Sequence, residues 1–299
     1  MLARPVEDEH AAVLARLDVP PISLSKRMAS KMLCEAPMTF WQPWKSTLFA
    51  VALVVTPTQV RGQIRIHSVA VASGFAPGLP APGSLAAIFC TGLQGTDGVQ
   101  VKVGNIAAPV LAVVGFPEYQ QINFQVPWEA DSSTVVVTQG AAADSFYANT
   151  PLRWTVFFTD AAGNIAALHA GGTRVVTPAD PARPGEWIVA YGSNLGAVAN
   201  PPANGTPTPS DHQFPLSTAQ NLYYLISGAS GVQASFMGLA PGLVGVYQVA
   251  MRVPDDPSLR GMDLRIERVH LCPPPQDAQC ARGLWLTYSD TAHLPVGMP

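Results

Sequence analysis

From residue 63 to residue 299, apolar runs the length of a β-strand alternate with clusters of Gly, Pro, Asn and Asp. Runs such as Ser84–Phe89 and Ile122–Val126 are typical of strands, and turn signals such as Gly95–Gly98 separate them. No long stretch between these runs has the hydrophobic period of a helix. The pattern therefore predicts an all-β protein built from sandwiches or barrels.

Two blocks of this pattern occur twice, in the same order. Pro82–Leu93 returns as Pro184–Leu195, and Tyr119–Pro127 returns as Tyr247–Pro254. Ordered repetition indicates a duplicated structural unit. We therefore expect two tandem domains after an N-terminal extension, with the three segments at 1–62, 63–158 and 159–299.

Both copies of the first block have the same physical plan. A Pro-Gly turn precedes an apolar run, and Gly92 or Asn194 ends the run by adopting a positive φ. The Leu that follows is then expected to turn inward. Trp187 lies in the second copy of the apolar run, and we expect it in the core because an indole ring buries a large apolar area.

A set of motifs carries a resemblance to a known family. The set resembles the uncharacterised C-terminal module of exported proteins from Solibacter-type acidobacteria, over about residues 66–270, and that module is similar to IPT/TIG immunoglobulin-like domains. The resemblance implies an exported bacterial chain of two tandem immunoglobulin-like β-sandwiches, with no established activity to transfer. Cys90 stands where the family usually has Gly. The motifs are Phe75-Ala76-Pro77-Gly78, Ala81-Pro82-Gly83-Ser84, Ile88-Phe89-Cys90-Thr91-Gly92-Leu93, Gln121-Ile122-Asn123-Phe124-Gln125-Val126-Pro127, Pro181-Ala182-Arg183-Pro184-Gly185-Glu186, Tyr191-Gly192-Ser193-Asn194-Leu195-Gly196 and 238–248.

The N-terminal extension contains a pattern typical of a signal peptide. Lys45 is followed by the uncharged stretch Ser46–Val60, with an apolar centre at Leu48–Val55. This centre is shorter than the roughly 20 residues of a membrane-spanning helix, but it fits a signal-peptide h-region. Cleavage after Gly62, or near 56–58, would leave a secreted, periplasmic or cell-surface chain with no stable transmembrane span. The alternative is a short buried helix or strand, and Met28, Met32 and Met38 are later start sites that would shorten the extension.

Two cysteines frame a proline-rich loop near the C-terminus. Cys272 and Cys280 enclose seven residues that begin with three prolines. A disulfide between them is plausible in an oxidising compartment, and two unrelated thiols are the alternative. Cys90 lies in a predicted core strand, where a free thiol packs as a small hydrophobic side chain.

Charge and motif content exclude several classes of function. Charged residues make up 12% of the chain, the net charge is −3, and Lys102 is the only lysine after residue 62, so no basic face for nucleic acid is expected. The six histidines are dispersed, without the spacing of a zinc site. The chain also lacks a phosphate-binding loop, a Gly-x-Ser-x-Gly elbow and a calcium loop. We therefore expect no metal, no cofactor and no enzymatic activity.

The remaining candidates are aromatic side chains and loops. Trp128 and Tyr224 lie beside strand ends and are the candidate binding residues for a sugar-stacking platform, although burial in the core is the commoner role of such rings. The sequence favours a non-catalytic, exported structural or interaction module that recognises a surface protein or polysaccharide through strand edges and loops. The candidate loops are 200–215 and 238–245. The alternative function is a carbohydrate-binding module that uses exposed aromatics.

Overall fold

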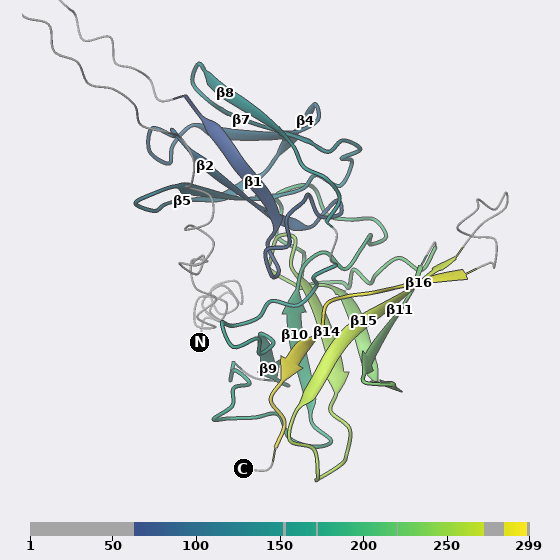
Figure 1. Cartoon of the computed structure of the whole chain (residues 1–299). Helices are drawn as coiled ribbons and strands as arrows, with labels where there is room; N and C mark the ends of the chain where they lie inside the picture. The colour runs from purple at the N-terminus through teal and green to yellow at the C-terminus, as the bar shows by residue number, and fades with distance from the viewer. Residues whose placement is uncertain (1–62, 152–153, 172, 220, 272–283, 298–299) are drawn as a thin grey trace, which may run out of the picture. The chain divides into compact units, whose positions relative to one another are not determined.

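The computed structural model describes residues 63–151, 154–171, 173–219, 221–271 and 284–297 (Figure 1). Every helix or strand assigned within these ranges is a strand, and all strand pairs between named strands are antiparallel. The predicted all-β fold class is confirmed. The signal-like segment and the Cys272–Cys280 pair both lie outside the described residues.

The first eight strands form two four-stranded sheets, ordered β1-β2-β6-β5 and β4-β3-β7-β8. Apolar residues of both sheets, including Ile88, Phe124 and Val137, form one core between them. The strands are β1 (Arg65–Val71), β2 (Leu85–Thr91), β3 (Val99–Val103), β4 (Ile106–Ala108), β5 (Val110–Gly115), β6 (Gln120–Gln125), β7 (Thr134–Gln139) and β8 (Ala142–Tyr147).

The later strands repeat this order in two further sheets, β9-β10-β14-β13 and β16-β15-β11-β12, and β17 continues along β15. In both halves the sheets follow the immunoglobulin arrangement, in which strands A, B, E and D form one sheet and C′, C, F and G form the other. The prediction of two tandem immunoglobulin-like sandwiches is therefore confirmed. The strands are β9 (Ala167–His169), β10 (Trp187–Gly192), β11 (Asn221–Ser227), β12 (Ser230–Gly231), β13 (Ala234–Leu239), β14 (Tyr247–Arg252), β15 (Met262–Leu271), β16 (Leu284–Tyr288) and β17 (Ala292–Leu294).

The repeated blocks of the sequence form the central pair of one sheet in each sandwich. Strands β2 and β6 pair in the first sandwich, where Ile88 lies opposite Ile122. Strands β10 and β14 pair in the second, where Ala190 lies opposite Val249. All four side chains are buried, so the duplication has preserved central strands that face each core.

The ends of the repeated strands behave as expected. Gly92 has a φ of 89° and Asn194 a φ of 63°, and the leucine after each is buried. The expectation for Trp187 was wrong, because it is 36% exposed. It is the first residue of β10, and its neighbour Ile188 faces the core, so the alternation of a strand turns the indole outward.

The Ser-Asn pair of the second copy binds the first sandwich. Ser193 accepts a hydrogen bond from the backbone N–H of Leu85 (2.9 Å), and Asn194 Oδ1 accepts one from the N–H of Ala81 (3.0 Å). Ser193 also donates to the carbonyl of Gly245 (3.2 Å). Residues 156–158, which precede the predicted boundary, pair with β10 through Phe157. The motif therefore links the two sandwiches.

The two candidate contact loops form hydrogen bonds to other parts of the chain and to each other. Asn204 accepts a hydrogen bond from the backbone N–H of Trp128 (2.9 Å) and donates one to Glu129 (2.7 Å). Thr208 exchanges backbone hydrogen bonds with the second loop, at Leu243 (3.1 Å) and Gly242 (2.8 Å). These contacts occupy parts of both loops, so strand edges are the better candidates for recognition.

Candidate functional site

The two predicted binding aromatics lie in different sandwiches. The Trp128 ring is half-buried and lies directly against Gly83, where an added Cβ would fall 1.9 Å from a ring carbon. Its indole Nε1 is buried without a hydrogen-bond partner among the described residues. Tyr224 is 49% exposed on β11. The structure therefore does not bring the two rings together in one aromatic platform.

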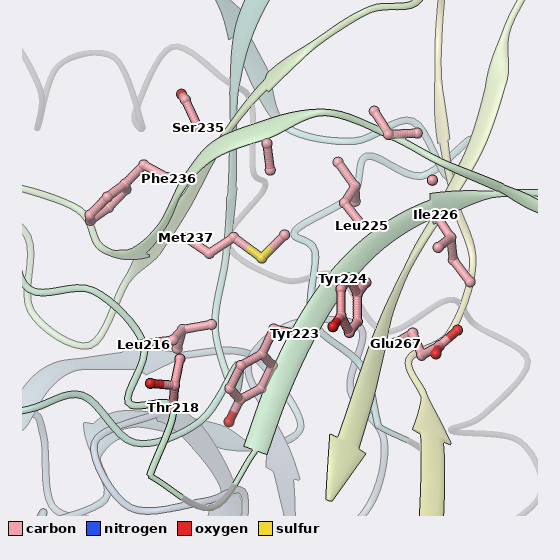
Figure 2. Close-up of a pocket in the computed structure, with 13 residues that line it drawn as sticks. Leu216, Thr218, Tyr223, Tyr224, Leu225, Ile226, Ser235, Phe236, Met237 and Glu267 are labelled. Carbon is pink, nitrogen blue, oxygen red and sulfur yellow. The ribbon is translucent and has the colours of Figure 1, made fainter.

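Tyr224 instead borders a groove on one side of the second sandwich, between β11 and β13 (Figure 2). The groove has a volume of about 590 Å³ and is mainly apolar. Figure 2 shows Met237 extending from β13 toward Leu225 on β11, with Tyr223 and Leu216 beside it. Tyr223 and Met237 pack against the core of the sandwich, so the bottom of the groove is continuous with that core.

One wall of the groove is a strand edge with unpaired backbone groups. Val232 donates its N–H to the carbonyl of Leu225 (2.8 Å), so Leu225 directs its backbone groups away from β15 and toward this side. Because backbone direction alternates along a strand, Tyr223 and Asn221 direct theirs to the same side. The short strand β12 reaches only Ile226 and Ser227, and no described backbone group pairs with Tyr223 here.

The opposite wall is the outer edge of β13, which is partly covered. The N–H of Leu216 bonds to the carbonyl of Met237 (3.0 Å), and the N–H of Leu239 bonds to the carbonyl of Phe214 (2.9 Å). A register shift between Ala234 and Phe236 interrupts the pairing of β13 with β14. Bulges of this kind protect a sheet edge from further pairing, so β11 offers the more regular edge to an incoming strand.

At one end of the groove, Tyr223 lies beside Arg268. Burial raises the pKa of the Tyr223 phenol, and burial also lowers the pKa of the nearby Arg268 guanidinium. Arg268 lies over the Trp154 ring, 4.3 Å from its centroid, and its Nε donates to Thr287 (3.2 Å). Tyr223 stays neutral at physiological pH and forms a fixed wall of the groove.

The described residues contain no cluster of three or more His, Cys, Asp and Glu side chains able to hold a metal ion. The most connected histidine is His169, which is buried and bonds to Glu186 (2.7 Å) and to the carbonyl of Asp180 (3.3 Å). Asp180 in turn pairs with Arg174 (3.2 Å). These bonds tie the 174–186 segment to β9, which is a structural role.

No family model matches the chain, and no curated relative matches it. Among solved structures, it is similar to an ectodomain fragment of ICAM-5, with 13% identity, 73% of this chain and 49% of that chain covered, and a TM-score of 0.23. The chain thus spans about half the length of that fragment. It is also similar to the titin Z1Z2 domains in complex with telethonin, with 8% identity, 79% and 98% covered, and a TM-score of 0.20. At these TM-scores, the assignment of the fold rests on the strand order.

Several residues of the groove were not predicted from the sequence. Met237 and Glu267 line it, and neither belongs to a motif. A usable signal was present in 222–226, which is apolar at every position. A strand of an exposed antiparallel sheet normally alternates apolar and polar residues, so this run indicates a strand with two covered faces or a binding face.

Proposed function

We propose that the chain is an exported, non-catalytic interaction module that binds an extended, apolar segment of a protein partner at the groove between β11 and β13. The observation that carries the proposal is the edge of β11, where the backbone of Tyr223 faces the groove without a strand partner. An extended peptide would add hydrogen bonds at such an edge and place alternate side chains in adjacent pockets. Met237, Phe236 and Ile226 are half-buried and provide apolar surface for those side chains.

We favour a protein partner over a polysaccharide. The two predicted stacking rings cannot act as one platform, because Trp128 is half-buried against Gly83 and Tyr224 belongs to the other sandwich. Tyr223 and Tyr224 are consecutive in β11, so their rings lie on opposite faces of the strand. The carbohydrate alternative predicts that Trp128→Ala or Tyr224→Ala abolishes retention on polysaccharide, while the groove proposal predicts no such retention.

Export is supported by the sequence. The apolar segment Leu48–Val55 follows a lysine, and the Solibacter-type module that the chain resembles belongs to exported proteins. Among the described residues, none forms an apolar helix of membrane-spanning length. On the sequence pattern, we propose that the module acts in the periplasm, at the cell surface or in the medium, where an interaction module meets its partner.

A peptide-binding experiment tests the groove directly. A library of extended peptides with alternating apolar residues would be screened by fluorescence anisotropy, and bound peptides would be mapped by amide hydrogen exchange. We expect slower exchange at Tyr223 and loss of binding in Met237→Lys, whose melting temperature is checked separately. Leu111→Lys, at an exposed apolar position of the first sandwich, is the matched control and should bind normally. A library without binders, or peptides that bind both variants equally, would refute the proposal.

A further inference from the structure

The outer face of the sheet containing β11, β15 and β16 carries two cross-strand rows of apolar side chains. Leu222, Val269 and Leu286 occupy one register position on the three strands, and Tyr224 and Tyr288 flank Glu267 at another. The intervening residues of β11 and β15, Leu225 and Ile266 among them, face the core. Since alternate side chains of a strand point to opposite faces, both rows point away from the core.

This face exposes more apolar side-chain surface than the solvent side of a sheet usually does. Tyr224 is 49%, Leu286 47% and Tyr288 44% exposed, and they are three of the six large hydrophobic side chains that are exposed among the described residues. The solvent side of an antiparallel sheet is ordinarily polar. Several exposed apolar side chains on one sheet face are typical of an interaction site.

Two opposite charges lie at the centre of the face. Arg265 and Glu267 are two residues apart on β15, so they share the outer face. Neither forms an ion pair within the described part of the chain. Arg265 lies 4.7 Å from the centroid of the Tyr288 ring, and its Nη2 donates to the carbonyl of Gly228 (3.5 Å). Its Nε is buried without a hydrogen-bond partner among the described residues.

We infer that this face binds the same face of a second copy of the chain. A two-fold axis that crosses the strands at Ile266 reverses the direction of β15, so Arg265 of each copy lies opposite Glu267 of the other. Two complementary ion pairs then form at the centre. Tyr224 and Tyr288 flank them and exclude water, which strengthens charged pairs at an interface. An axis parallel to the strands would instead place Glu267 against Glu267, which like-charge repulsion disfavours.

The size of the face indicates a weak dimer. Three strands spaced about 4.8 Å apart give a face that is roughly 15 Å wide before side chains are added. With strands of seven residues, or about 24 Å, such a face covers roughly 360 Å². This is less than half of the about 800 Å² that each partner buries in a standard interface. We therefore expect concentration-dependent dimerisation, with a dissociation constant in the micromolar range. The inference goes beyond the proposed function, because it concerns self-association, although Tyr224 and Glu267 of this face also line the peptide groove.

Complementary charge reversal tests the inference. Arg265→Glu and Glu267→Arg each place like charges opposite one another, so each variant alone should raise the dimer dissociation constant about tenfold or more. Mixing the two variants restores both ion pairs in a heterodimer. A single chain that carries both substitutions also restores them and should dimerise alone. Analytical ultracentrifugation of the full chain measures these four samples and the wild type.

Controls separate this interface from folding and from the groove. Equal melting temperatures would show that the variants fold, and Met237→Lys, which alters the groove, should dimerise like the wild type. The inference is overturned if the wild type stays monomeric at several hundred micromolar, if both single variants dimerise normally, or if the mixture remains monomeric. Peptide binding by a monomeric wild type would overturn the dimer while leaving the proposed function intact.

Discussion

Gly83 donates its backbone N–H to the carbonyl of Val126 (2.8 Å), which joins the turn before β2 to the end of β6. The same bond recurs in the second sandwich between Gly185 and Val253 (3.1 Å). Both glycines have a positive φ, of 81° and 77°. The two repeated sequence blocks are therefore held together in each sandwich by equivalent hydrogen bonds, although the side chains around them differ.

The two glycines should respond differently to the same substitution. Gly83→Ala adds a Cβ that would overlap the Trp128 ring, where the nearest ring carbon is 1.9 Å away. We expect a loss of about 3 kcal/mol of unfolding free energy, because steric overlap adds to the cost of a positive φ. Urea denaturation of the purified protein measures this loss.

Gly185→Ala is the matched control for that substitution. Its φ is also positive, but the nearest atom to an added Cβ is Asp255 Oδ1 at 3.4 Å, an ordinary contact. We expect a loss of about 1 kcal/mol, from backbone conformation alone. Equal losses at the two positions would contradict the assigned packing of Trp128 on Gly83.

Repetition made much of the fold predictable. The two blocks correspond to β2 with β6 and to β10 with β14, which are central strands, so their apolar residues are kept by the demands of the core. Trp187 shows where the reasoning failed. At the equivalent position, Leu85 is half-buried and packs against a small cluster on the second sandwich, whereas no comparable cover for Trp187 exists among the described residues.

The candidate site was harder to predict than the fold. Tyr224 was selected correctly as an exposed ring, but its neighbours in space come from β13 and β15, which are distant in sequence. The groove exists because β12 is too short to cover the edge of β11. Whether an edge stays uncovered depends on the length of the neighbouring strand and on the order of strands in the sheet. Neither can be read from the sequence of β11 alone.

Ser193 should contribute measurably to the coupling of the two sandwiches. It is fully buried and bonds to both Leu85 and Gly245. Ser193→Ala leaves the Leu85 N–H without this acceptor, so we expect a loss of about 1–3 kcal/mol of unfolding free energy. Urea denaturation checks the value. Ser235→Ala, at an exposed position, should change stability by less than about 0.5 kcal/mol, and a similar effect of both variants would argue against the interface.

The Cys90 thiol should be unreactive in the folded protein. Burial raises its pKa from 9.0 to about 11, so the neutral thiol predominates at pH 8. Iodoacetamide should label Cys90 only after denaturation, as read by peptide mass spectrometry.

Burial of Cys90 should also make stability depend on pH. Because the pKa of the thiol is higher in the folded protein than in the unfolded chain, the associated stability is present below pH 9 and is lost as the pH rises through about 11. Cys90→Ala should lack this loss, and rapid labelling of the native thiol would contradict its burial.

The most direct test of an exported interaction module is the N-terminal sequence and intact mass of the native protein from separated cell fractions. We predict a mature chain that begins between residues 57 and 68 and is found in the periplasm, at the surface or in the medium. Its mass should be lower by two hydrogen atoms if Cys272 and Cys280 are bridged. A chain that begins at Met1 and is confined to the cytosol would contradict export and, with it, the proposed setting of the groove.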